Sequence, residues 1–229
     1  MDLPEKHCFR TRSVQPLDEA WARAASSFCL KMGLSWGVIC IFSMLFAIAS
    51  MASFMVAGDQ TDVFDTILAW GAAVICILMR LICHKIAVKQ LESGTGSPAG
   101  VIYNEFTDRL ADVLILVGSG YSGAGEPGVV KLFDMLPLGW CAASMALVSD
   151  YLRLLGASLT GFQDFRGSMT QPQRMAVLTL GSCIELVQHL TDWERWGIKL
   201  ALTLLVLGGL VTCWRRLHGI HIFYQKRLK

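Results

Sequence analysis

Long apolar segments separated by short polar ones are the first regularity of this chain. A bilayer core of about 30 Å requires roughly 17 to 25 residues of helix, and six stretches meet that length. They cover residues 34–57, 64–84, 103–121, 133–156, 174–190 and 195–214. The third and the fifth are interrupted by charged residues, among them Asp108 and Glu185. The pattern predicts an all-α, polytopic membrane protein with six transmembrane helices.

The basic residues are distributed unevenly between the two sides of these stretches. Sixteen of the twenty lysines and arginines lie in the regions 1–33, 80–100, 152–174 and 215–229. Three belong to the alternate side (Lys131, Arg195 and Lys199), and Arg109 lies inside the third stretch. Because cytoplasmic loops carry the excess of Lys and Arg in membrane proteins, this distribution predicts that both termini are cytoplasmic.

The same pattern divides the chain into three parts. We expect a cytoplasmic segment with an interfacial helix at residues 1–33, a six-helix membrane domain at 34–217 and a basic cytoplasmic tail at 218–229. The first apolar stretch has full span length and no cleavage site follows it, so no signal peptide is expected. The composition agrees with this class, since 54% of the residues are hydrophobic and the mean hydropathy is +0.50. A net charge of +2 gives no reason to expect a nucleic-acid partner.

The most unusual polar positions lie in the segment "GVIYNEFTDRLADVLIL" at the start of the third stretch. Asn104, Asp108 and Asp112 recur every four residues, so they share one face of a helix that enters the membrane from the cytoplasm. A charge at bilayer depth costs at least about 2.5 kcal/mol and therefore needs a partner or a function. Arg109, four residues after Glu105 and three before Asp112, is placed to neutralise part of this stripe. Two interpretations stay open: an interhelical ion pair, and a cation or phosphate site open to the cytoplasm.

Two segments resemble the CDP-alcohol phosphatidyltransferases, which are six-span enzymes with a cytoplasm-facing active site. The family motif, D-x2-D-G-x2-A-R-x8-G-x3-D-x3-D, joins the second span to the third. The sequence "YNEFTDRLAD" (103–112) is similar to its second half, in a form typical of one bacterial branch. The connection at 149–174 is similar to the same branch at Ser149, Tyr151, Gly156, Gly167, Met169 and Arg174. The resemblance extends over residues 34 to 217.

The resemblance implies a chemistry for the aspartates. In that family, carboxylates hold divalent cations on the diphosphate of a CDP-linked lipid, and the last aspartate deprotonates an acceptor alcohol. It implies Asp108 as catalytic base, and Asp108 and Asp112 as ligands of Mg²⁺ or Mn²⁺. The implied substrate-binding residues are Gly100, Asn104, Arg153 and Arg174.

The resemblance also implies partners and a location. The partners are CDP-diacylglycerol or another CDP-linked lipid, a small alcohol and the surrounding membrane lipids. A homodimer is an open alternative. The implied location is the inner membrane of a bacterium, which the chain crosses several times.

The first half of the motif is absent. Matching Gly100 and Asp108 to the last glycine and the last aspartate leaves only these two of eight positions intact. A shift by four residues, with Asp108 and Asp112 as the final pair, does not recover the rest. Between Asp65 and Glu105 the only acidic residue is Glu92, so the end of the second stretch supplies no pair of carboxylates.

Two functions therefore stay open. The first is a divergent enzyme of phospholipid biosynthesis that transfers a phosphatidyl group from CDP-diacylglycerol to a small alcohol. The second is a non-catalytic relative that binds lipid or a protein partner. Four or more carboxylate oxygens around Asp108 favour the enzyme, whereas two do not.

Overall fold

The structure, a computed structural model, describes residues 16–59, 63–93, 98–122, 135–160, 169–191, 193 and 196–227. This described part of the chain forms seven α-helices. They are α1 (Pro16–Lys31), α2 (Trp36–Asp59), α3 (Val63–Glu92), α4 (Pro98–Tyr121), α5 (Met135–Thr160), α6 (Gln171–Leu190) and α7 (Gly197–Arg227). Helices α2 to α7 coincide with the six predicted apolar stretches, which confirms the all-α class. Residues 1–15, 131, 166, 167, 195 and 228–229, which the sequence interpretation also uses, lie outside the described ranges.

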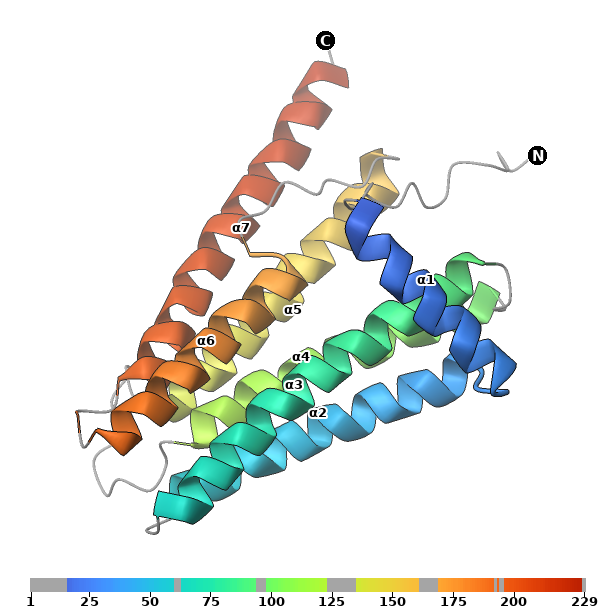
Figure 1. Cartoon of the computed structure of the whole chain (residues 1–229). Helices are drawn as coiled ribbons and strands as arrows, with labels where there is room; N and C mark the ends of the chain where they lie inside the picture. Colours follow the sequence, from blue (N-terminus) through green and yellow to red (C-terminus); the bar gives the residue numbers. More distant parts are fainter. Residues whose placement is uncertain are drawn as a thin grey trace.

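The helices form a bundle with two diverging limbs (Figure 1). In one limb α2 packs against α3 and α4, and in the other α7 packs against α5 and α6. Contacts of α4 with α5 and of α3 with α6 join the limbs. Consecutive helices from α2 to α7 run in opposite directions, so that α1 and the C-terminal end of α7 lie at the same end of the bundle (Figure 1). The end of α3, the start of α4, the end of α5 and the start of α6 lie at this end as well (Figure 1).

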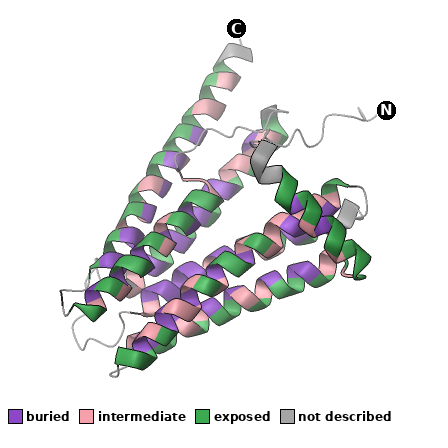
Figure 2. Ribbon diagram, viewed as in Figure 1, coloured by how far each residue is buried: buried purple, intermediate pink, exposed green. Residues whose placement is uncertain are grey.

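Apolar side chains cover much of the outer surface, as expected of a membrane protein. Among the described residues, three segments are long and apolar enough to cross a membrane: Trp36–Gly58, Val63–Glu92 and Gly197–Phe223. Exposed positions follow the outward faces of all the helices (Figure 2) and include many large hydrophobic side chains. Helices α4, α5 and α6 have 24, 26 and 20 residues, and at 1.5 Å per residue each is about 30 Å long or more. That all six cross the membrane, with cytoplasmic termini, stays a prediction, as does the division at residues 33 and 217.

Small residues allow the helices to approach closely. A Cβ atom at Gly139 on α5 would lie 2.8 Å from the Cα atom of Gly120 on α4. A Cβ atom at Gly181 on α6 would lie 2.5 Å from the Cβ atom of Ala201 on α7. Lipid chains are as apolar as leucine, so helices in a membrane associate largely through such close van der Waals packing.

A glycine turn connects α1 to α2. Gly33 has a φ of 76°, and Leu34 N–H donates to the Cys29 carbonyl oxygen at 2.9 Å, as in a Schellman motif. The turn directs α1 back against α3. There, Lys85 Nζ lies 5.6 Å from the ring centroid of Trp21. Helix α1 is thus held against the C-terminal half of α3.

Side chains of α6 cap the beginning of α7. Glu185 Oε2 accepts a hydrogen bond from Ile198 N–H at 3.0 Å. Gln188 Oε1 accepts from Gly197 N–H at 3.1 Å and from Trp196 N–H at 3.2 Å. The first N–H groups of a helix have no partner within it, and a negative charge is favourable at that end. The charge that interrupts the fifth apolar stretch is therefore a buried helix cap.

Candidate functional site

The polar stripe lies along one face of α4, as its spacing predicts, and the structure shows that this face is buried. Asn104, Asp108 and Asp112 are 8%, 5% and 2% exposed. Asn104 lies opposite α2, where Cys40 Sγ donates to its Oδ1 atom at 3.3 Å. The two aspartates meet side chains of α3 instead. The stripe is therefore an interhelical contact surface, and its partners decide what it can bind.

Arg80 on α3 lies between the two aspartates. Its side chain is fully buried, with Nη2 2.8 Å from Asp112 Oδ1 and 3.6 Å from Asp108 Oδ1. The same nitrogen donates to the Asp108 carbonyl oxygen at 3.1 Å. One turn further along α3, His84 Nδ1 lies 2.9 Å from Asp108 Oδ1. Charge counting groups Arg80 with the basic residues of an inner connection, but its surroundings are the protein interior. Its position inside the second apolar stretch is the signal that identifies it.

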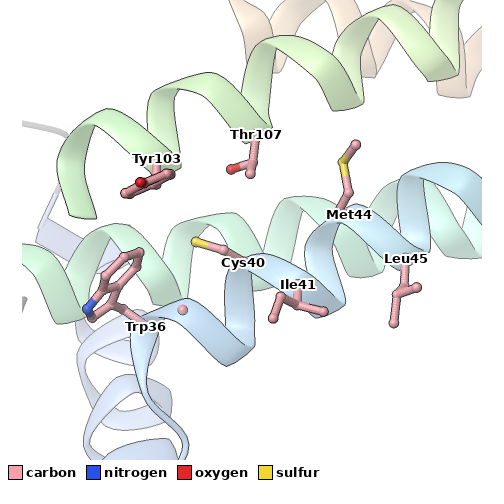
Figure 3. A pocket seen from close by; sticks show the side chains of 8 residues that line it. Trp36, Cys40, Ile41, Met44, Leu45, Tyr103 and Thr107 are labelled. Atoms are coloured by element: carbon pink, nitrogen blue, oxygen red, sulfur yellow. The ribbon is translucent and has the colours of Figure 1, made fainter. Parts of the chain in front are cut away.

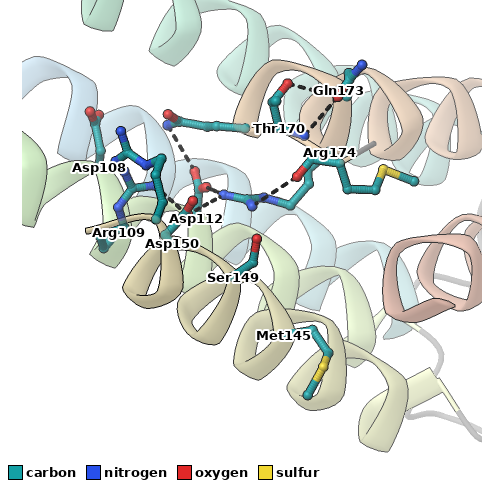
Figure 4. A network of polar contacts seen from close by, with 12 residues as sticks. Asp108, Arg109, Asp112, Met145, Ser149, Asp150, Thr170, Gln173 and Arg174 are labelled. Atoms are coloured by element: carbon teal, nitrogen blue, oxygen red, sulfur yellow. Dashed lines mark hydrogen bonds and ion pairs between the residues drawn. The ribbon is translucent and has the colours of Figure 1, made fainter. Parts of the chain in front are cut away.

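Arg174 on α6 joins α4 to α5. Its Nη2 atom lies 2.9 Å from Asp112 Oδ2 and 2.8 Å from Asp150 Oδ2 (Figure 4). Asp112 therefore has an arginine on each carboxylate oxygen. Asp150 has further partners, since Arg109 Nη1 lies 2.5 Å from its Oδ2 atom and Arg216 Nη1 lies 3.8 Å from its Oδ1 atom.

The network extends to the protein surface through Glu105. Arg109 pairs with Glu105, as the spacing of four predicts. Its second ion-pair partner is Asp150 on α5, whereas the direct ion pairs of Asp112 are made with Arg80 and Arg174. Arg153 Nη2 lies 2.5 Å from Glu105 Oε1, and the Glu105 side chain is 37% exposed. The polar interior therefore connects with the end of the bundle where α4 begins and α5 ends.

The segment before α6 positions Arg174. Gln173 Oε1 accepts a hydrogen bond from Thr170 N–H at 2.8 Å, and Met169 N–H donates to Thr212 Oγ1 on α7 at 3.2 Å. These contacts fix the first turn of α6 against α7, with Thr170 and Gln173 beside the ion pairs (Figure 4). Arg174 thus lies in the first turn of a capped helix, and the position of this turn orients its side chain toward the ion pairs.

We call this set the arginine–carboxylate network. Its members are Arg80, His84, Glu105, Asp108, Arg109, Asp112, Asp150, Arg153, Arg174 and Arg216. Guanidinium groups stay charged in proteins, and the five arginines outnumber the four carboxylates by one. Within the described part of the chain, no three His, Cys, Asp or Glu side chains are grouped so that they could hold a metal ion. The carboxylate oxygens around Asp108 face arginines.

The predicted substrate-binding residues have different surroundings. Arg153 and Arg174 belong to the network, and Asn104 lies at its α2 side. Gly100 is buried against Trp36, where a Cβ atom would lie 2.8 Å from the ring atom Cζ2. At Gly100 the structure shows a packing requirement. Roles of all four residues in binding a substrate stay predictions.

An apolar groove of about 380 Å³ lies between α2 and α4 (Figure 3). It is lined by Trp36, Gly37, Cys40, Ile41, Met44, Leu45, Tyr103 and Thr107. Cys40 also contacts Asn104, and Thr107 directly precedes Asp108 in the chain. An amphiphilic molecule would therefore find an apolar surface and a charged cluster side by side.

Comparison with known proteins shows what the fold resembles. No protein-family model matches the chain, and no curated protein matches its sequence. The fold resembles that of phosphatidylinositol phosphate synthase (PgsA1) from Mycobacterium tuberculosis. The PgsA1 structure in complex with manganese and citrate has a TM-score of 0.65 and 17% identity, covering 87% of this chain and 88% of that one. The structure with CDP-DAG bound has a TM-score of 0.62 and 17% identity, covering 87% and 92%. The apo structure has a TM-score of 0.62, again with 17% identity, covering 85% and 93%. The chain thus has a PgsA1-like fold along most of its length.

Proposed function

We propose that this protein is a phosphatidyltransferase-like membrane protein of phospholipid metabolism that binds a CDP-linked lipid, such as CDP-diacylglycerol, at the arginine–carboxylate network. We further propose that it does not transfer the phosphatidyl group by a divalent-metal mechanism. We assign it to the inner membrane of a bacterium, with the network facing the cytoplasm. The observation that carries the proposal is the pairing of Asp112 with two arginines, one on each oxygen.

Three features support a lipid ligand. The first is the likeness to PgsA1, which has been solved with CDP-DAG bound. The second is the excess of arginine over carboxylate in the network, because guanidinium groups form charge-assisted hydrogen bonds with phosphate. Arg153 lies at its exposed edge beside Glu105. The third is the adjoining groove between α2 and α4, which offers an apolar surface for a hydrocarbon chain.

The side chains of the network do not form a suitable ligand set for a divalent cation such as the manganese in the PgsA1 complex. Mg²⁺ and Mn²⁺ prefer oxygen ligands, typically several of them. Both oxygens of Asp112 contact guanidinium groups, and Asp108 Oδ1 faces His84 and Arg80. A divalent cation at this place would lie beside a buried permanent positive charge, where repulsion is weakly screened. We therefore assign no metal-dependent step to these residues.

A second candidate function is the transfer reaction itself, with Asp108 as base. One observation favours it: within the described part of the chain, the ion pairs of Asp108 involve only Oδ1. The other oxygen is thus available to accept a proton from an alcohol within hydrogen-bond reach. Mg²⁺ or Mn²⁺ and a small alcohol belong to this candidate alone.

Binding is tested with the purified protein in lipid nanodiscs. We expect CDP-diacylglycerol to raise the melting temperature saturably, because a ligand of the folded state stabilises it, whereas diacylglycerol does not. Arg153→Gln should weaken binding about tenfold, the size expected for one hydrogen bond to a charged group. Arg215→Gln removes the same charge from an exposed position of α7 and should bind like the wild type. Equal responses to CDP-diacylglycerol and diacylglycerol would disprove the proposal.

Transfer is tested separately by the release of CMP from CDP-diacylglycerol with Mg²⁺ or Mn²⁺ and a panel of small alcohols. The proposal predicts no release above a protein-free control. Release that Asp108→Asn abolishes would establish the second candidate instead.

A further inference from the structure

We infer that the Arg80 guanidinium is a built-in counter-ion that takes the place of a divalent cation between Asp108 and Asp112. The inference starts from one nitrogen atom. Arg80 Nη2 lies 2.8 Å from Asp112 Oδ1, 3.6 Å from Asp108 Oδ1 and 3.1 Å from the Asp108 carbonyl oxygen. A single cationic group therefore contacts three oxygens that belong to two consecutive turns of α4.

The need for such a group follows from the spacing of the aspartates. Carboxylates four residues apart on a helix repel each other, and in a buried setting each uncompensated charge costs several kcal/mol. Asp108 and Asp112 are 5% and 2% exposed, so water does not compensate them. Bound divalent cations and guanidinium groups are the two usual compensations. At this position the chain supplies the guanidinium itself.

The geometry suits arginine in particular. The planar guanidinium offers five donors in a fixed fork, whereas a lysine ammonium is a point charge. Gln171 on α6 contributes a further acceptor. With its amide oxygen turned toward the guanidinium, Gln171 Oε1 accepts from Arg80 Nη2 at 2.9 Å and from Arg80 Nη1 at 3.2 Å. From α2, Ser43 Oγ donates to the backbone carbonyl oxygen of Arg80 at 3.5 Å. Arg80 is thus held by α2, α4 and α6 at once.

This assignment predicts that a cation site appears when Arg80 is replaced by a carboxylate. Arg80→Asp removes the positive charge, adds a third carboxylate to the pair and leaves room because its side chain is shorter. Three carboxylates around one space form a ligand set that hard divalent cations favour. In the wild type the guanidinium fills that space, so divalent cations should leave the protein unaffected.

The experiment measures Mn²⁺ binding by electron paramagnetic resonance, and melting temperature in EDTA and in excess Mn²⁺, on full-length protein in nanodiscs without CDP-diacylglycerol. We expect no tightly bound Mn²⁺ and no shift of melting temperature in the wild type. Arg80→Asp should melt lower in EDTA and regain stability in Mn²⁺, with one bound ion that Arg80→Asp/Asp112→Asn no longer holds. Arg215→Asp makes the same exchange at an exposed arginine, and its melting temperature should be the same in EDTA and in Mn²⁺. Wild-type protein that binds Mn²⁺ in a way that Asp112→Asn removes would overturn the inference, as would folded Arg80→Asp that binds none.

A neutral pair of variants decides the question if Arg80→Asp does not fold. Arg80→Gln and Asp112→Asn each leave one buried charge without its partner, so each should lower the melting temperature. If Arg80 is the counter-ion of Asp112, the double variant should lose clearly less than the sum of the single losses. Additive losses would overturn the inference. Because no CDP-linked lipid enters these measurements, their failure is distinguishable from failure of the proposed lipid binding.

Discussion

Arg216 on α7 donates from Nη1 to Ser149 Oγ on α5 at 2.9 Å, and also to the Ser149 carbonyl oxygen. This contact holds α5 and α7 together beside the arginine–carboxylate network. Arg216 is 3% exposed, whereas the preceding Arg215 is exposed to the surroundings. Two adjacent arginines therefore have opposite environments.

The contrast predicts opposite effects of the same substitution. Arg216→Met should lower the free energy of unfolding by about 1 to 3 kcal/mol, because it leaves the buried oxygens of Ser149 without this donor and Asp150 Oδ1 without its ion-pair partner. Arg215→Met should change it by less than about 0.5 kcal/mol, as is usual for surface positions. Reversible unfolding in mixed micelles measures both values. Similar losses for the two variants would show that the α5–α7 contact does not depend on Arg216.

The helices of this fold are predictable because their cause is local. Apolar stretches of span length and the basic connections between them locate α2 to α7 without any knowledge of packing. The α4 stripe is likewise predictable, since a repeat of four places Asn104, Asp108 and Asp112 on one face. What hydropathy leaves out is which helix each face contacts, because antiparallel bundles of similar helices pack in several ways.

The partners of the stripe illustrate this limit. Arg80 lies inside an apolar stretch, and the positive-inside count treats it as part of a connection. Its pairing with Asp112 depends on how α3 and α4 pack, which residue spacing along one helix does not specify. Asp150 and Arg174 lie in a segment found by family resemblance, yet their contact joins two different helices. In the sequence, Glu185 is a charge that interrupts the fifth apolar stretch. Its role as a cap of α7 becomes visible only when α6 is packed against α7.

The cap at the beginning of α7 gives a second prediction. Glu185→Ala should lower the free energy of unfolding by about 1 to 2 kcal/mol, because Ile198 N–H loses its acceptor at the positive end of a helix. Glu185→Gln keeps an acceptor oxygen in the same place and should lose less. Melting temperatures in nanodiscs measure the order wild type, Glu185→Gln, Glu185→Ala. A stable Glu185→Ala variant would mean that water or Gln188 replaces the acceptor.

The close packing of α6 against α7 gives a third prediction. Gly181→Ala should destabilise the protein by about 1 to 3 kcal/mol, because the new Cβ atom would lie 2.5 Å from that of Ala201. Gly71→Ala on α3 is the matched control, since nothing lies within 4 Å of its Cβ position. There the helix propensity of alanine should make the change neutral or stabilising by up to about 1 kcal/mol. Adding Ala201→Gly to Gly181→Ala should restore part of the loss, and additive losses would contradict the packing.

The fourth prediction concerns the difference between arginine and lysine in the network. Arg174 Nη2 lies within 2.9 Å of a carboxylate oxygen of both Asp112 and Asp150, and the Arg174 side chain is 4% exposed. A lysine keeps the charge but lacks the planar fork, so it cannot reproduce the geometry that joins α4, α5 and α6. Arg174→Lys should therefore lower the free energy of unfolding by about 1 to 3 kcal/mol, the cost of leaving a buried charged acceptor without its hydrogen bond.

Arg153→Lys is the matched comparison at the edge of the same network. Its partner Glu105 is 37% exposed at the side chain, so solvent replaces what the lysine does not supply. Exposed ion pairs contribute about 0 to 1 kcal/mol, and the loss should stay within that range. Unfolding of both variants in mixed micelles, at low and high salt, measures the difference. Screening by salt should reduce the small loss at Arg153 and leave the larger loss at Arg174 unchanged, because buried pairs are screened much less. Equal losses at the two positions would mean that the interior pair behaves like a surface pair, which the burial of Asp112 contradicts.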